Sequence, residues 1–185
     1  MKNNPFEKVA KIKFSKLEDF EIRAMLMTHA EPRDQYMEYI IKYARPLSDE
    51  TMKVLYHKIG DHSYLSAIFS EMAMSPVFIE YLIKNAKGIL LSSVIKHQKI
   101  PDKTLMDHID QLELIDSHLK KVIISEKLET PSYLHKFATD GGYFERMLVV
   151  GNPNMTETLL KMLTTDPYKP VSTEAKRRLK SKLFK

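Results

Sequence analysis

The 185-residue chain is 43% hydrophobic and 29% charged, which are ordinary values for a globular protein with a sizeable core. It contains no cysteine, which excludes a disulfide framework, thiolate zinc sites, cysteine-held iron–sulfur clusters and a cysteine nucleophile. The net charge of +5 is uneven, with +6 on residues 169–185, +4 on residues 1–16 and −5 between them, which is not the pattern of a uniformly basic groove.

An atypical N-terminal region, residues 1–46, holds the first predicted elements. Ser15 and Glu18 have the spacing of a capping box, which predicts a helix that runs to about His29. Another helix is predicted to begin at Pro32. Three of its tyrosines share one helix face and are candidate partner-binding residues: Tyr36, Tyr39 and Tyr43. A partly buried seam between two helices explains the same spacing equally well.

Residues 47–170 repeat a two-helix pattern about every 26 residues. The first helix of each unit begins after a serine, a threonine or a proline, at steps of 27, 26, 29 and 26 residues: Ser48, Ser75, Pro101, Thr130 and Thr156. The serine and threonine side chains are expected to cap these helices. The second helix of each unit is predicted at residues 64–72, 90–97, 119–125 and 144–150. No segment alternates with a period of two, so we predict an all-α chain of about twelve short helices.

Apolar positions also match from unit to unit. At an offset of 26 residues, Leu134 and Phe137 fall on Leu160 and Leu163, which predicts that these residues lie in the core. Helices this short are marginal alone, because helix nucleation is costly, so they are expected to gain their stability by stacking. We therefore predict one domain over residues 1–185, with its two-helix units stacked into a short α-solenoid. The alternative is an irregular helical bundle whose 26-residue spacing is a coincidence.

One unit, VVGNPNMTETLLKMLTTDPYKPV, resembles the leucine-rich repeat variant, a helical repeat distantly similar to HEAT repeats. The matching residues are Asn152, Pro153, Asn154, Leu159, Leu160, Leu163, Asp166, Pro167 and Val171. The resemblance implies a curved, right-handed superhelix that serves as a binding surface and carries no catalytic residues. Earlier units keep the helical plan but depart from the motif, since residues 97–101 (HQKIP) stand where the asparagine turn belongs. The cysteine-ligated cluster of some family members has no counterpart here.

The sequence contains no motif for catalysis. The seven histidines show no His-Glu-x-x-His or similar ligand spacing, and no phosphate-cradling glycine loop or G-x-S-x-G nucleophile elbow occurs. An enzyme would need a site assembled across several units. We therefore predict a protein that is not an enzyme, with no metal, no cofactor and no evident small-molecule substrate.

The basic C-terminal segment, residues 171–185, is predicted to be a capping helix. Ala175, Leu179 and Leu183 form its apolar stripe. Its cations are candidate partner-binding residues: Lys176, Arg177, Arg178, Lys180 and Lys182. They could contact nucleic-acid phosphates or an acidic protein. A capping helix also needs a polar face and favours cations near its C-terminus, which accounts for many of the same residues.

Two functions follow from these features. The first is a non-enzymatic helical-repeat adaptor or regulatory protein whose concave face binds another protein. The alternative is a nucleic-acid-binding protein that contacts phosphates through the basic C-terminal helix. No apolar run approaches the roughly 20 residues of a membrane span, and the N-terminus lacks the apolar core of a signal peptide. A soluble cytoplasmic protein with no membrane partner is expected.

Overall fold

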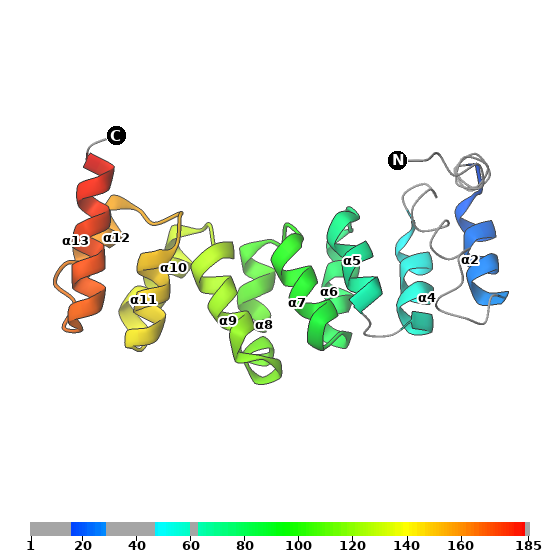
Figure 1. Cartoon of the computed structure of the whole chain (residues 1–185), viewed down its shortest axis with the longest axis horizontal. Coiled ribbons are helices and arrows are strands. Elements are labelled where there is room, and N and C mark those ends of the chain that lie inside the picture. The colour runs from blue at the N-terminus through cyan, green and yellow to red at the C-terminus, as the bar shows by residue number, and fades with distance from the viewer. Residues whose placement is uncertain (1–15, 29–46, 60–62, 184–185) are drawn as a thin grey trace, which may run out of the picture. The chain divides into compact units, whose positions relative to one another are not determined.

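The computed structural model describes residues 16–28, 47–59 and 63–183 (Figure 1). Within these ranges the chain forms eleven α-helices and one π-helical turn, with no strand, which confirms the predicted all-α class. The elements are α2 (Asp19–Thr28), α4 (Asp49–Ile59), α5 (Ser63–Glu71), α6 (Pro76–Asn85), α7 (Gly88–His97), α8 (Asp102–Ile115), α9 (Ser117–Val122), η1 (Ile123–Lys127), α10 (Pro131–Asp140), α11 (Tyr143–Gly151), α12 (Glu157–Leu163) and α13 (Lys169–Leu183). None of these helices is both long and apolar enough to cross a membrane.

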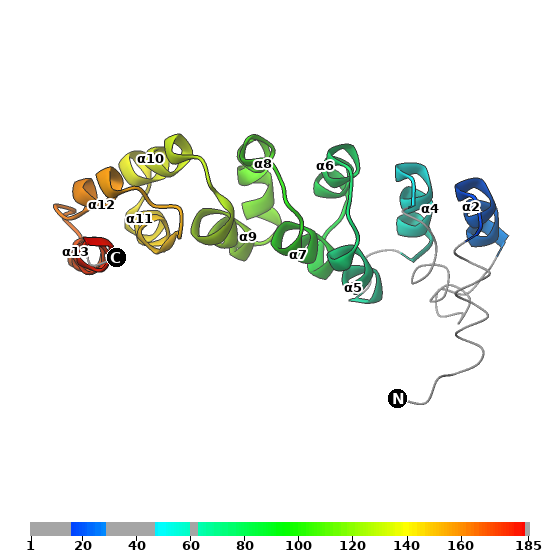
Figure 2. The ribbon, with the colours of Figure 1, turned by 90° about the horizontal axis from the view of Figure 1, so that it is seen from above.

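Contacts within the chain cluster into two compact units, an N-terminal unit, Met1–Lys99, and a C-terminal unit, Ile100–Lys185. In the N-terminal unit, α4 packs against both α2 and α6, while α5 packs against α7. In the C-terminal unit, α8, α10 and α12 form one layer, and α9, η1, α11 and α13 form the other (Figure 2). Each of the pairs α8–α9, α10–α11 and α12–α13 is a helical hairpin whose two helices lie in different layers.

Local signals place most helix starts as predicted. Ser75 and Thr156 accept hydrogen bonds from backbone N–H groups three residues later, at 3.0 and 3.2 Å. Ser48 caps α4 in the same way, with 3.2 Å between the Thr51 nitrogen and the Ser48 Oγ. The predicted side-chain cap at Thr130 is wrong, because α10 begins after Thr130 without a side-chain cap bond. The Thr130 backbone N–H instead donates to the Asp102 carboxylate at 2.6 Å.

The core consists of the apolar positions that recur in each hairpin. Leu134, Leu160 and Leu163 are all buried, as their spacing predicts. In the N-terminal unit, the buried rings of Phe69 and Phe78 meet edge to face with centroids 5.5 Å apart. This is a favoured geometry for two aromatic rings in a core.

Polar side chains join neighbouring hairpins by binding the carbonyl groups at helix ends. The buried Asn152 amide donates to the carbonyl oxygens of Ile124 and Leu128, at 2.8 and 3.0 Å. In the other unit, the Gln98 amide donates to Phe69 and Met72 carbonyl oxygens in the same manner, at 2.6 and 3.0 Å. The last carbonyls of a helix have no partner within it, so these amides satisfy groups that burial would otherwise leave unpaired.

Gln98 therefore does the work of Asn152, although the sequence around it departs from the asparagine turn. Both amides reach the end of a helix that lies between 24 and 29 residues earlier in the chain. An asparagine or a glutamine can supply the two N–H donors that the arrangement needs. The departure at residues 97–101 leaves this interaction in place.

Candidate functional site

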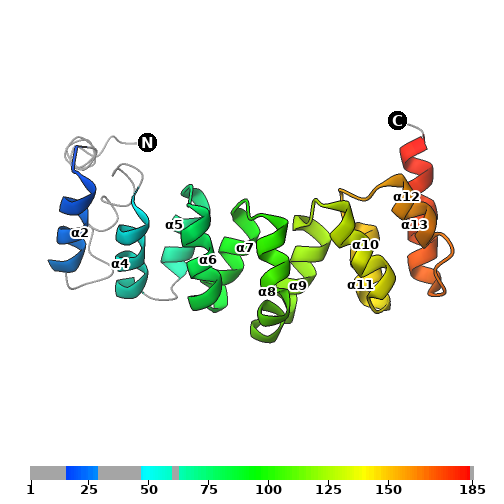
Figure 3. The same cartoon turned by 180° about the vertical axis from the view of Figure 1, so that it is seen from behind.

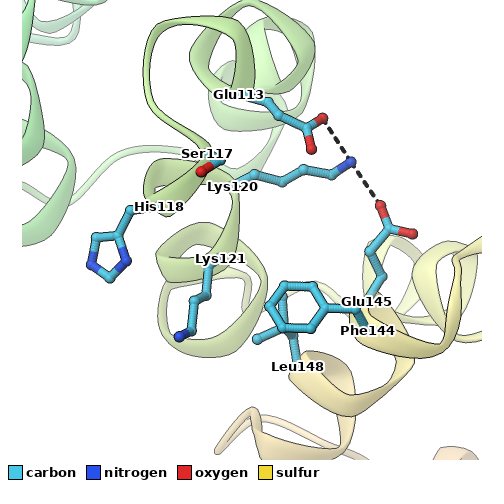
Figure 4. A pocket seen from close by; sticks show the side chains of 8 residues that line it. All are labelled: Glu113, Ser117, His118, Lys120, Lys121, Phe144, Glu145 and Leu148. Carbon is cyan, nitrogen blue, oxygen red and sulfur yellow. Dashed lines mark hydrogen bonds and ion pairs between the residues drawn. The ribbon is translucent and has the colours of Figure 1, made fainter.

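An open cleft of about 420 Å³ lies between α9 and α11 in the C-terminal unit, with the end of α8 beside it (Figure 4). Its lining combines charged, polar and apolar side chains: Glu113, Ser117, His118, Lys120, Lys121, Phe144, Glu145 and Leu148. The volume falls in the range of ligand-binding pockets. None of these eight residues belongs to the candidate sites that the sequence predicts.

Lys120 closes one side of the cleft by bridging two helices. Its ammonium group lies 2.9 Å from a Glu113 carboxylate oxygen on α8 and 2.7 Å from a Glu145 oxygen on α11 (Figure 4). The lysine side chain is mostly buried, which by itself lowers its pKa, but the hydrogen bonds and charges of the two glutamates outweigh burial and raise the pKa. Lys120 therefore stays protonated at neutral pH, and a permanent cation cannot act as a general base.

Glu145 is fixed from two directions. One of its oxygens binds Lys120, and the other accepts the Gly142 backbone N–H at 2.7 Å at the start of α11. The hydrogen bond from Lys120 is the main reason that the pKa of Glu145 lies below its usual range, and burial opposes the shift. The ion pair between Glu145 and Lys120 therefore links α11 to α9 beside the cleft.

The other side of the cleft is apolar and open. Phe144 is 52% exposed although it is aromatic, and it lies beside the buried Leu148 on α11 (Figure 4). Lys121 and His118 project from α9, and both are exposed. Among the described residues, Lys121 forms no ion pair within 4.0 Å. An exposed aromatic ring beside a lysine that forms no ion pair is an arrangement suited to binding rather than to stability.

The α8–α9, α10–α11 and α12–α13 turns lie along one edge of the C-terminal unit (Figures 1 and 3). Each turn carries an exposed apolar side chain. We call this edge the turn edge. Leu114 is 89% exposed in the first turn. Tyr143 and Tyr168, from the second and third turns, are partly exposed and pair with ring centroids 4.8 Å apart. Phe144, which follows Tyr143 in the chain, lines the cleft, so exposed apolar side chains are present both at the turn edge and at the cleft.

The two layers of the C-terminal unit differ sharply in charge. The layer of α9, η1, α11 and α13 contains ten lysines and arginines against three glutamates, a formal charge of +7. The layer of α8, α10 and α12 contains three cations against six acids, a formal charge of −3. Most of the positive charge of this layer, +5, lies on α13, whereas the residues that line the cleft include two lysines and two glutamates.

Arg178, a predicted partner contact, is engaged inside the protein. Its guanidinium donates to the carbonyl oxygens of Val150 and Asn152, the latter at 2.8 Å. It thus binds the C-terminal end of α11, as Asn152 binds the end of η1. The sequence alone assigned it to the exposed face of the basic helix, because the carbonyl acceptors lie in a different hairpin.

The other predicted cations of α13 divide into paired and exposed residues. Arg177 forms an ion pair with Glu174 at 2.6 Å on its own helix. Lys176 and Lys180 are exposed. The side chain of Lys182 lies outside the described residues, and so do Tyr36, Tyr39 and Tyr43. The predicted tyrosine surface therefore stays a prediction.

The described residues contain no group of three or more histidine and acidic side chains arranged to hold a metal ion. His57, which lies in the N-terminal unit, shares a hydrogen bond of 2.8 Å with the Tyr81 hydroxyl. His118, in the C-terminal unit, lines the cleft.

Comparison of the chain with protein-family models, with curated proteins and with solved structures gives no match. The resemblance of residues 149–171 to the leucine-rich repeat variant therefore stays a prediction.

Proposed function

We propose that the protein is a non-enzymatic helical-repeat adaptor that binds another protein through the C-terminal unit. The observation that carries this proposal is the apolar turn edge, where Phe144, Tyr143 and Tyr168 stay exposed beside an open cleft. Aromatic side chains are enriched at protein interfaces and cost solubility when they are left exposed without a partner.

The architecture that we propose for this adaptor is a right-handed α-solenoid of the HEAT-like or leucine-rich repeat variant kind. Two facts support it: the hairpins of the C-terminal unit place their helices in two layers, and polar side chains bind helix ends 24 to 29 residues earlier. Solenoids of this kind use extended surfaces to bind partners. Such a protein works by presenting a rigid surface.

The test is affinity purification of the full chain with quantitative mass spectrometry, comparing wild type with Phe144→Ser. Ile89→Ser is the matched control, because Ile89 is 63% exposed and is the second residue of α7, as Phe144 is of α11. We expect a reproducible protein partner that Phe144→Ser loses and Ile89→Ser retains. A partner captured equally by all three proteins, or no protein partner at all, contradicts the proposal.

Nucleic-acid binding through α13 is the second candidate, and the exposed Lys176 and Lys180 favour it. Binding to phosphates releases counterions, so the affinity should fall steeply with salt. A gel shift at two salt concentrations with wild type and with Lys176→Gln/Lys180→Gln tests this. Arg178 must be left intact, because its loss would disturb the end of α11. Affinity that is insensitive to salt or to these substitutions rules out the basic helix as the contact.

A further inference from the structure

The paired tyrosines of the turn edge indicate the kind of partner that the C-terminal unit binds. We infer, on the basis of the proposed adaptor function, that Tyr143 and Tyr168 bind a proline-rich segment of a partner protein in the polyproline II conformation. Three features carry this inference: the two rings are exposed as a pair, their hydroxyl groups are free, and the turns that present them are linked by one side chain.

The two rings form one aromatic surface. Tyr143 is 58% exposed and Tyr168 is 40% exposed, and their ring centroids lie 4.8 Å apart with the ring planes tilted by 50°. The aromatic pair of Phe69 and Phe78, by contrast, is buried in the core of the N-terminal unit. Exposed tyrosines offer a partner a large contact area at a low cost in entropy, because each side chain has only two rotatable torsions.

The hydroxyl groups of the pair are available to a partner. Among the described residues, neither the Tyr143 hydroxyl nor the Tyr168 hydroxyl forms a hydrogen bond. A partner that covers the rings must offer acceptors to these hydroxyls, because a donor that loses its water without a new acceptor is unfavourable. A polyproline II segment supplies both kinds of contact, since its prolines present apolar rings and its carbonyl groups form no internal hydrogen bonds.

The Arg146 side chain links the two turns that carry the tyrosines. Its guanidinium donates to the Gly141 carbonyl oxygen at 2.8 Å, in the turn before Tyr143, and to the Asp166 carboxylate at 2.6 Å. The almost fully buried Asp166 side chain in turn accepts the Tyr168 backbone N–H at 2.8 Å. Arg146 is thus a positioning residue for both tyrosines, and a site that is formed in advance loses little entropy on binding.

Other modes of peptide recognition lack what they require at this edge. Addition of a strand needs the edge of a sheet, and the described residues contain no strand. An α-helix uses most of its carbonyl groups internally, so it would leave the two tyrosine hydroxyls without acceptors. Acidic or phosphorylated segments are bound by clusters of arginine, and the arginines of α11 and α13 are already engaged: Arg146, Arg177 and Arg178. A polyproline II segment needs exposed aromatic rings with hydrogen-bond donors, and the turn edge has both.

The experiment is a display selection of short random peptides on the immobilised full chain, which needs no known partner. We expect the enriched peptides to share prolines spaced by about three residues, the repeat of the polyproline II helix. A fluorescein-labelled copy of the leading peptide is then titrated by anisotropy. Replacing its prolines with alanine should weaken binding roughly tenfold or more, because the peptide loses its ring contacts and its preformed conformation.

Protein variants locate the binding site. Tyr143→Ser and Tyr168→Ser should each weaken binding of the leading peptide roughly tenfold or more, the range of interface hot spots. Tyr143→Phe and Tyr168→Phe keep the rings and lose only the hydroxyls, so each should weaken binding about two- to tenfold, the range of one hydrogen bond. The control Ile89→Ser, at an exposed apolar side chain of the N-terminal unit, should bind as wild type does. Thermal melting of each variant separates a lost site from a lost fold.

Arg146→Lys tests the positioning role. In the wild-type background this change should weaken binding of the leading peptide severalfold, because the turn that carries Tyr168 loses its link to the turn before Tyr143. In the Tyr168→Ser background its effect should be smaller, because one of the two rings that it positions is already absent. An equal effect in both backgrounds overturns the positioning role of Arg146.

The outcomes separate this inference from the adaptor function on which it rests. Enriched peptides without proline, whether acidic or helix-forming, overturn the inference and leave the adaptor function standing. An affinity unaffected by Tyr143→Ser and Tyr168→Ser also overturns it, because the peptide then binds elsewhere on the chain. The absence of any enriched peptide overturns it too, and the purification experiment then decides the adaptor function independently.

Discussion

The two units solve the same packing problem but present different surfaces to solvent. In the C-terminal unit, the layer of α9, η1, α11 and α13 carries +7, whereas α5 and α7 of the N-terminal unit together carry no net charge. The buried contacts are nevertheless of one kind, because Gln98 and Asn152 bind helix ends alike. Packing therefore constrains the buried positions and leaves the exposed ones free to differ. In the C-terminal unit the exposed positions form a charged, partly apolar surface.

The core gives the largest expected effects in both units. Phe69→Ala should cost about 3–5 kcal/mol of unfolding free energy, and Leu160→Ala about 2–5 kcal/mol, because each removes a fully buried side chain and leaves a cavity. Urea denaturation measures the cost, and hydrogen exchange locates it in the unit that carries the change. The exposed Lys136→Ala should stay within about 0.5 kcal/mol. If Leu160→Ala costs no more than Lys136→Ala, the 26-residue register of the C-terminal unit is wrong.

The side-chain amides of Asn152 and Gln98 offer a direct test of the likeness between the units. Asn152→Leu and Gln98→Leu should each cost about 3 kcal/mol. Gln98→Leu leaves the Phe69 and Met72 carbonyls without their donor, and Asn152→Leu leaves the Ile124 carbonyl without its donor and the Asn154 N–H without its acceptor. Asn85→Leu is the control, since the exposed Asn85 amide donates to Tyr81 within its own helix, and it should cost less than about 1 kcal/mol. A harmless Gln98→Leu beside a damaging Asn152→Leu would break the equivalence of the two residues.

Within the basic helix α13, the loss of a cation bound inside the protein should lower stability more than the loss of an exposed cation. Arg178→Met should cost about 2 kcal/mol, because a guanidinium bound to two backbone carbonyls is lost from the end of α11. Lys176→Met should stay within about 0.5 kcal/mol, because the side chain is exposed. Chemical denaturation of both variants decides the order. Equal costs would mean that Arg178 belongs to the exposed face, as the sequence first indicated.

The helix N-caps allow a comparison between a hydroxyl that caps its helix, that of Ser75, and one that does not, that of Thr130. Ser75→Ala should cost about 1 kcal/mol, because Ser75 accepts from the Phe78 N–H and donates to Asp49. Thr130→Ala should stay within about 0.5 kcal/mol, because the Thr130 hydroxyl does not cap α10. Thermal melts compare the two. A Thr130→Ala variant as unstable as Ser75→Ala would restore the side-chain cap that the sequence predicts.

The smallest expected effect concerns the dependence of stability on pH under acidic conditions. Burial acts to raise the pKa of Asp19, but hydrogen bonds from Ser48 and Thr51 outweigh it, so the pKa lies below 3.8 in the folded protein. The stabilisation by this carboxylate is therefore complete above the unfolded pKa and is lost as pH falls through the folded value. Asp19→Asn should flatten the loss of stability below about pH 4, as melts across the acid range would show. A variant that keeps the wild-type acid slope contradicts this assignment.

The sequence predicts those features of the fold that depend on residues close together in the chain. Ser75 and Thr156 sit directly before amphipathic runs, and Leu134 and Leu160 recur at one spacing, so caps and core could be predicted. The match of Gln98 to Asn152 could not, because both side chains bind carbonyls of another hairpin.

The cleft escaped prediction for the same reason. Lys120 meets Glu113 and Glu145 only once α8, α9 and α11 have packed. One signal was nevertheless present in the sequence. Counting charge separately on alternate helices of residues 102–183 reveals the +7 and −3 layers, whereas the counts by terminal and middle segments mixed them.

The hydrogen bonds from later side chains to earlier helix ends also have a consequence for folding during synthesis. The carbonyls of Ile124 and Leu128 receive their donor from Asn152, which leaves the ribosome 28 and 24 residues later. The Val150 carbonyl waits in turn for Arg178, 28 residues further on. At synthesis rates of about 5–20 residues per second, each helix end spends on the order of a few seconds before its partner emerges. A nascent hairpin is thus completed only by the one that follows it, and a translational pause just before Asn152 would prolong the exposure of an unfinished helix end.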